Sequence, residues 1–151
     1  MLRGTYSPIK ILILVIKTMQ QYQQESLLGA MALSKGNYQD AVYHIEKALA
    51  LAKLAGLNSN DETFEADYFN MAQSKKAMRR FTEAISDYQK VLTLNSKNES
   101  AYIRITECCF EIDTPVAIEL SNLNASDNIK KIVREEFKYI LELLDFDRKA
   151  H

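Results

Sequence analysis

The chain contains an internal repeat, and this feature most narrows the folds that it can adopt. Residues 28–51 match residues 71–94 position by position, with an offset of 43 residues. Each copy has a small residue, an aromatic residue nine positions later and a second small residue three positions after that. These are Gly29, Tyr38 and Ala41 in the first copy, and Ala72, Phe81 and Ala84 in the second. The pattern predicts two pairs of antiparallel helices, each crossing where its two small residues face each other.

The composition favours a single helical domain. A length of 151 residues fits one domain with one core, residues 1–151. The chain has only 4 glycines and 2 prolines, which argues against a turn-rich β-sandwich or barrel. A hydrophobic share of 47% excludes disorder by composition, and a net charge of −1 excludes the strongly basic balance of a typical nucleic-acid-binding protein.

The segments from Tyr38 to Ala41 and from Glu83 to Ile85 resemble the tetratricopeptide repeat, a helix-turn-helix unit of about 34 residues. The resemblance implies an all-α, superhelical array of about three repeats with flanking N-terminal and C-terminal helices. The repeats fall at about residues 22–55, 65–98 and 99–123, and a capping helix falls at about residues 126–147.

The sequence departs from the tetratricopeptide pattern at three places. The offset is nine residues longer than one repeat, so around residues 53–64 either a helix is extended or a loop intervenes. Ser96 stands at the usual proline position. The third repeat is degraded, because its second helix, which starts at Thr114 and Pro115, is short and Ala117 comes one place early.

The amino end holds a short apolar run from Ile9 to Lys17. It is too short for a secretory signal or a membrane span. Ser7 as cap and Pro8 as first residue favour a helix, with Ile9, Leu12, Ile13 and Ile16 packed on the end of the domain. A strand, or residual sequence from a neighbouring domain, is the alternative. An exposed apolar face here would be a docking or aggregation surface.

The residues of catalysis and metal binding are scarce. His44 and His151 are the only histidines, and no phosphate-binding loop or nucleophile motif occurs, so we expect no enzyme, no metal and no cofactor. Cys108 and Cys109 are adjacent in a predicted helix and cannot form an ordinary disulfide with each other. Their use fits a reducing, cytoplasmic compartment, and Cys108 reads better as a small core residue than as a reactive thiol.

The repeat register predicts a binding groove lined by the first helix of each repeat. Its lining is apolar with few charges, which suits an extended peptide or a helix. The candidate groove residues are Leu27, Phe69, Asn70, Gln73, Lys76, Ile103, Arg104 and Phe110.

One branch of the tetratricopeptide family, the co-chaperones, uses this groove as a five-residue carboxylate clamp for the acidic tails of heat-shock chaperones. Asn70 and Arg104 stand at two of the five clamp positions, and the other three hold Ser26, Ala30 and Ser100. The resemblance implies a non-catalytic protein- or peptide-binding adaptor with a weakened clamp. The charge balance and the lack of a long apolar stretch predict that no nucleic acid or membrane is a partner. The alternative is a structural adaptor in a complex unrelated to chaperones; an enzyme is the poorest alternative.

Overall fold

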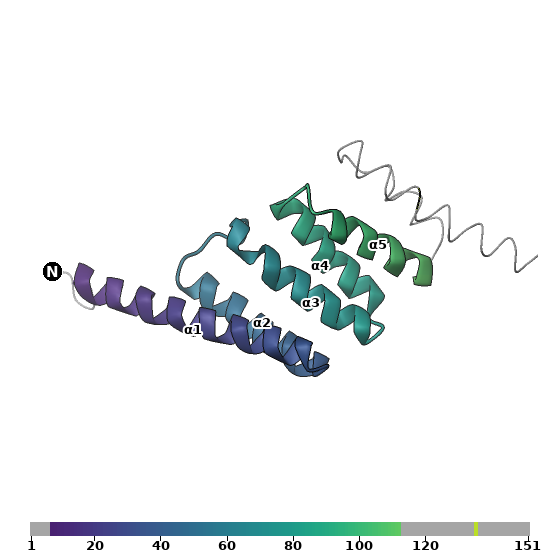
Figure 1. The fold of residues 1–151 in the computed structure, drawn as a ribbon. Coiled ribbons are helices and arrows are strands. Elements are labelled where there is room, and N and C mark those ends of the chain that lie inside the picture. The colour runs from purple at the N-terminus through teal and green to yellow at the C-terminus, as the bar shows by residue number, and fades with distance from the viewer. Residues whose placement is uncertain (1–6, 113–134, 136–151) are drawn as a thin grey trace, which may run out of the picture.

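The computed structural model describes residues 7–112 and Glu135. Within these residues the chain is entirely helical and contains no strand, so the predicted all-α class is confirmed (Figure 1). The elements are α1 (Pro8–Ser34), α2 (Tyr38–Leu54), the 3₁₀ helix η1 (Glu62–Phe64), α3 (Glu65–Ala77), α4 (Phe81–Leu94) and α5 (Glu99–Ile112). The predicted short helix at residues 115–123 and the capping helix at residues 126–147 lie outside the described residues.

The turns that close the α1–α2 and α3–α4 hairpins have the same backbone. Gly36 has a φ of 77° and Arg79, 43 residues later, has a φ of 63°. The hydrogen bonds also repeat at this offset. Asn37 N–H donates to the Ala32 carbonyl, and Arg80 N–H donates to the Lys75 carbonyl. Both hairpins therefore use the same turn geometry, which requires a residue with a left-handed backbone conformation at its centre.

Arg79→Gly is expected to raise the free energy of unfolding by up to about 1 kcal/mol, because a non-glycine residue is strained at positive φ. The side chain lost is mostly exposed: its guanidinium lies 3.7 Å from Glu111 and 5.2 Å from the centre of the Phe81 ring. Chemical denaturation measures the change. Gly36→Ala is the reverse change in the matched turn and should lower the free energy of unfolding by about as much. A Gly36→Ala protein more stable than the wild type would contradict this account of the turn.

Within each hairpin, the two helices cross at the predicted small residues. A Cβ atom built on Gly29 would come within 2.5 Å of Ile45 Cγ1 and 3.3 Å of the Ala41 carbonyl oxygen, so α1 and α2 touch at this point. In the second hairpin Ala72 and Ala84 are fully buried in one cluster with Tyr88. Close helix approach at these positions sets the geometry of both pairs.

A loop follows the first hairpin. Helix α2 ends at Leu54, and Gly56, with a φ of 81°, accommodates the turn that closes it. The Asp61 side chain then accepts a hydrogen bond from Thr63 N–H at 2.9 Å and caps η1. Phe64 is buried against Tyr22 of α1 and anchors the loop. Both alternatives for the nine extra residues therefore apply: α2, with 17 residues, is longer than α4, with 14, and most of the extra residues form the loop.

The amino end is helical, but it does not pack on the domain as expected. The predicted N-terminal helix and the first helix of the first repeat form one continuous 27-residue helix, α1. Ser7 caps it by accepting a hydrogen bond from Lys10 N–H at 3.2 Å. Its apolar residues Ile9, Leu12, Ile13 and Ile16 are all exposed. Because the helix runs straight, its first turns project beyond α2 and α3 and have no described surface to pack on (Figure 1).

Polar side-chain contacts link helix α1 to α3, and link α3 to α5 and the residue before it. Tyr22 and Ser26 of α1 donate to the carboxylate of Asp67 in α3. Glu65 of α3 accepts from Asn98, and Lys76 near the other end of α3 pairs with Glu107 of α5. Contacts at both ends of α3 mean that α3 and α5 run in the same direction. None of the described helices is long and apolar enough to cross a membrane.

Candidate functional site

The surface formed by α1, α3 and α5, which we call the α1/α3/α5 face, carries a charged cluster. Lys76 Nζ lies 2.8 Å from Glu107 Oε2, and Arg104 Nη1 lies 2.9 Å from Glu107 Oε1. Burial by itself would raise the pKa of Glu107, but the bonds from Lys76 and Arg104 outweigh it and hold this pKa below its ordinary value. Both cations therefore pair with the same carboxylate, and the three side chains together keep a net positive charge.

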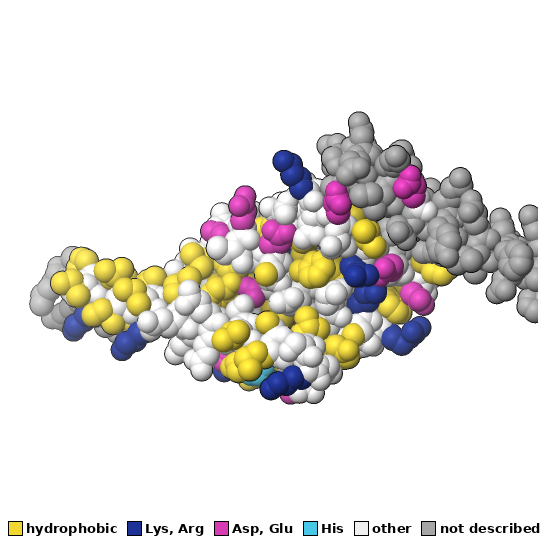
Figure 2. Space-filling model, in the orientation of Figure 1, with side chains coloured by type: hydrophobic (Ala, Val, Ile, Leu, Met, Phe, Trp, Pro, Cys, Tyr) yellow, Lys and Arg dark blue, Asp and Glu magenta, His cyan; other side chains and the backbone are white. Residues whose placement is uncertain are grey.

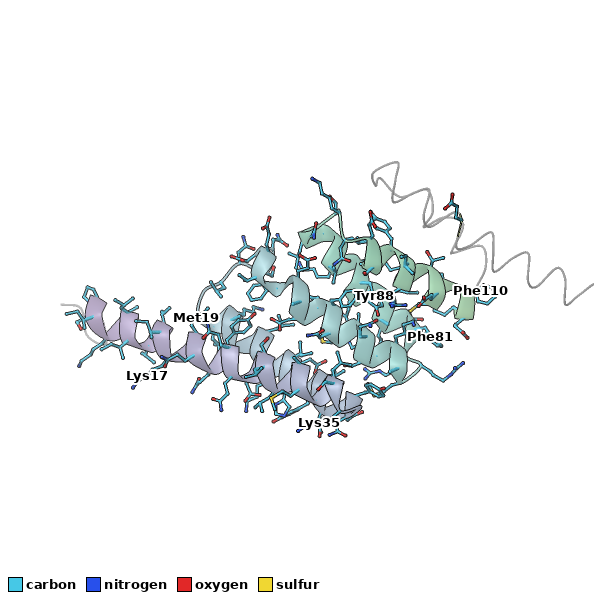
Figure 3. All side chains as sticks on the ribbon, in the orientation of Figure 1. Lys17, Met19, Lys35, Phe81, Tyr88 and Phe110 are labelled. Atoms are coloured by element: carbon cyan, nitrogen blue, oxygen red, sulfur yellow. The ribbon has the colours of Figure 1, made fainter. Side chains whose placement is uncertain are left out.

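Gln73, one turn before Lys76 on α3, is hydrogen-bonded to the core. Its side-chain carbonyl accepts a hydrogen bond from the hydroxyl of Tyr88, which comes from α4 between α3 and α5 (Figure 3). Tyr88 is fully buried, and burial raises the pKa of its hydroxyl above the ordinary value. The hydroxyl therefore stays protonated and holds Gln73 in a fixed position.

A hollow of about 580 Å³ lies beside the charged cluster, and residues of α1, α2, α3, α4 and α5 line it together with the α3–α4 turn. Leu33, Tyr38 and Phe81 supply its apolar part, and Lys76 and Glu107 its charged part. A site of this kind suits a peptide or a protein side chain with both apolar and polar groups.

Asn70 belongs to a second hollow, near the amino-terminal ends of α3 and α5. This hollow has a volume of about 440 Å³, and its lining includes Phe69, Asn70 and Ser100. Arg104 lines neither hollow and is bonded to Glu107 instead. The two residues that match the carboxylate clamp are thus placed in different surroundings.

The four apolar candidates differ in exposure. Leu27 is 60% exposed on α1, whereas Phe69, Ile103 and Phe110 are half-buried. Phe69 packs edge-on against the Tyr88 ring, with 5.5 Å between ring centres. Phe69 therefore contributes to the core as well as to the hollow, and Leu27 is the candidate most available to a partner.

The cysteines are core residues. Cys108 and Cys109 are free and fully buried, and burial raises the pKa of Cys108 to about 11 and that of Cys109 to about 12. Because the thiolate is the nucleophile, neither thiol is activated.

At pH 8, iodoacetamide is expected to label Cys108 and Cys109 at least about a hundredfold more slowly in the folded protein than in denaturant, since few thiolates form and both are buried. Mass spectrometry of the labelled protein measures the rates. Rapid labelling of either cysteine under native conditions would contradict the core assignment.

The chemistry on the described residues is that of contact surfaces. No group of three or more metal-ligating side chains occurs in the described part of the chain. The sequence analysis named Lys76 and Arg104 as groove residues but did not identify Glu107 as their shared partner. The signal was an acidic residue three positions after Arg104, the spacing of an ion pair on one helix.

The family model of the bacteriophage T4-like portal protein (Gp20) matches residues 61–151, more than half of the chain. The chain therefore belongs to this portal protein family. The matched region begins at the cap of η1 and includes α3, α4 and α5. No curated protein matches the chain.

This finding overturns two expectations. The family resemblance to tetratricopeptide repeat proteins is wrong, and so is the co-chaperone adaptor function derived from it. The small residues and the turn that carried the resemblance are what any close pair of antiparallel helices needs, so they report packing rather than ancestry.

Proposed function

We propose that the chain is a non-catalytic structural component of a viral particle that acts through protein contacts. The match to the portal protein family carries this proposal. The described site residues support it, because they form two hollows and an exposed ion-pair cluster rather than a nucleophile, a general base or a metal site. That the chain is not an enzyme, has no nucleic-acid partner and is cytoplasmic remain predictions from its sequence.

We propose further that the hairpins stack as a superhelical array. The two hairpins share one turn geometry, and α1, α3 and α5 lie in order on one face. Stacked hairpins of this kind present a continuous surface to a partner. The α1/α3/α5 face, with Leu27, Asn70, Gln73, Lys76 and Arg104, is the proposed contact surface for another protein.

Photo-crosslinking in assembled particles tests the proposed contact surface. A photoreactive amino acid replaces Leu27 or Asn70, which occupy equivalent positions of α1 and α3. The controls replace Glu46 or Gln89, which are exposed and equivalent on α2 and α4. We expect crosslinks to another protein from the first pair and few from the second. Equal crosslinking from both pairs, or crosslinking from the controls alone, would contradict the proposed surface.

A further inference from the structure

The first turns of α1, residues 8–17, form a projecting segment that we call the arm. Six of its large apolar side chains are between 47% and 70% exposed: Ile9, Ile11, Leu12, Ile13, Leu14 and Ile16. Tyr22 is the first buried residue along α1. Figure 2 shows apolar side chains gathered on this end of the molecule, beyond the rest of the helices. Burying so many apolar side chains would be strongly favourable, and an exposed apolar surface of this kind is typical of an interaction site.

The apolar side chains surround most of the arm rather than forming one stripe. Successive residues of a helix are rotated by about 100°, so the four consecutive residues from Ile11 to Leu14 point in four different directions. A groove on a protein covers one face of a helix and leaves the others in water. A fluid apolar medium covers the whole circumference, so this distribution favours lipid over a protein groove.

The charges of the arm favour an anionic surface. Lys10 and Lys17 are seven residues apart and fall on the same narrow stripe of the helix. Residues 1–24 include three basic residues and no acidic residue. Lysine stems pack along apolar surface while their ammonium groups stay at the headgroups. The side chain of Lys17 projects outward from the arm and is free to do so (Figure 3).

We propose that the arm inserts into the interface of a bilayer that contains anionic lipids. Residues 8–16 rise about 13 Å along the helix axis, which is less than half of a hydrocarbon core of about 30 Å. The arm is therefore too short to span the bilayer, and it lies along one leaflet with the stripe of Lys10 and Lys17 turned toward the phosphate groups. This inference concerns a different surface from the α1/α3/α5 face, does not depend on the proposed function, and replaces the expectation from the sequence that no membrane is a partner.

Tryptophan fluorescence tests the proposal directly, because the chain has no tryptophan. Ile13→Trp places one reporter on the arm of the full chain, where Ile13 is 47% exposed. Leu54→Trp places a control reporter on α2, at a site that is more exposed, at 81%. Vesicles of equal parts phosphatidylglycerol and phosphatidylcholine are added to each. We expect a blue shift for Ile13→Trp only, and a much weaker response to vesicles of phosphatidylcholine alone.

Further substitutions in the Ile13→Trp protein separate the two contributions. Lys10→Gln and Lys17→Gln should each weaken binding to the anionic vesicles by about fivefold. Leu12→Ser should weaken it by about tenfold to a hundredfold. The melting temperature should not change, because these exposed side chains do not support the core. An unchanged emission spectrum with vesicles would overturn the proposal. So would a dimer in sedimentation equilibrium that depends on Leu12 and forms without lipid, since the arm would then be covered by a second copy.

Discussion

Ala84→Leu is expected to lower the free energy of unfolding by about 1–3 kcal/mol. Ala84 is fully buried in the same cluster as Ala72 and Tyr88, where α3 and α4 cross. The three additional heavy atoms of leucine have no space there, so α4 must move away from α3 or the side chain must take a strained rotamer. Thermal or urea denaturation measures the loss.

Ser86→Leu is the matched control for the crossing. Ser86 lies two residues further along α4 and is exposed, so a leucine there should change stability by less than about 0.5 kcal/mol. If the Ala84→Leu and Ser86→Leu proteins had the same melting temperature, the two helices would not be tightly packed at Ala84, and the predicted helix register would be wrong.

Tyr22→Phe is expected to destabilise the protein by about 1.5–3 kcal/mol. The Tyr22 hydroxyl donates to Asp67, whose side chain is buried between α1 and α3. Removing this donor leaves the buried carboxylate with the hydrogen bond from the Ser26 hydroxyl but without the one from Tyr22, and a buried carboxylate needs several such bonds. Because Asp67 links the two hairpins, the substitution should also loosen α1 from α3.

Tyr43→Phe is the control for the loss of one hydroxyl, since Tyr43 is 59% exposed on α2. Its free energy of unfolding should stay within about 0.5 kcal/mol of the wild type. A double-mutant cycle of Tyr22→Phe with Asp67→Asn gives the coupling between the two side chains. Additive effects in this cycle would show that the hydrogen bond between them contributes little.

The helices, turns and crossings could be predicted because they depend on local sequence. Gly29, Ala72 and Ala84 mark the close approaches directly, and the 43-residue offset carries one turn geometry from Gly36 to Arg79. The all-α class follows from the same pattern. The helix crossings and the all-α class do not depend on the protein family that contains the hairpins. The local predictions were therefore correct although the predicted family and function were wrong.

The polar links and the fate of the arm could not be predicted because they depend on tertiary arrangement. Tyr22 and Asp67 are 45 residues apart, and nothing local to either signals the other. The pairing of Lys76 with Glu107 likewise depends on how α3 and α5 lie together. The residues around Leu12 can be buried only if another part of the protein lies beside the first turns of α1. Because α1 is straight, these turns extend beyond α2 and α3 and have no such neighbour among the described residues.

The central claim, that the chain is a structural component of a viral particle, is tested most directly by quantitative mass spectrometry of purified particles. The particles are taken through two successive density gradients, and peptides spanning residues 7–112 are counted against the major particle proteins. The account predicts that the chain copurifies in a fixed copy number that does not fall between the gradients. Its absence from particles, or a copy number that falls with each gradient, would contradict the claim.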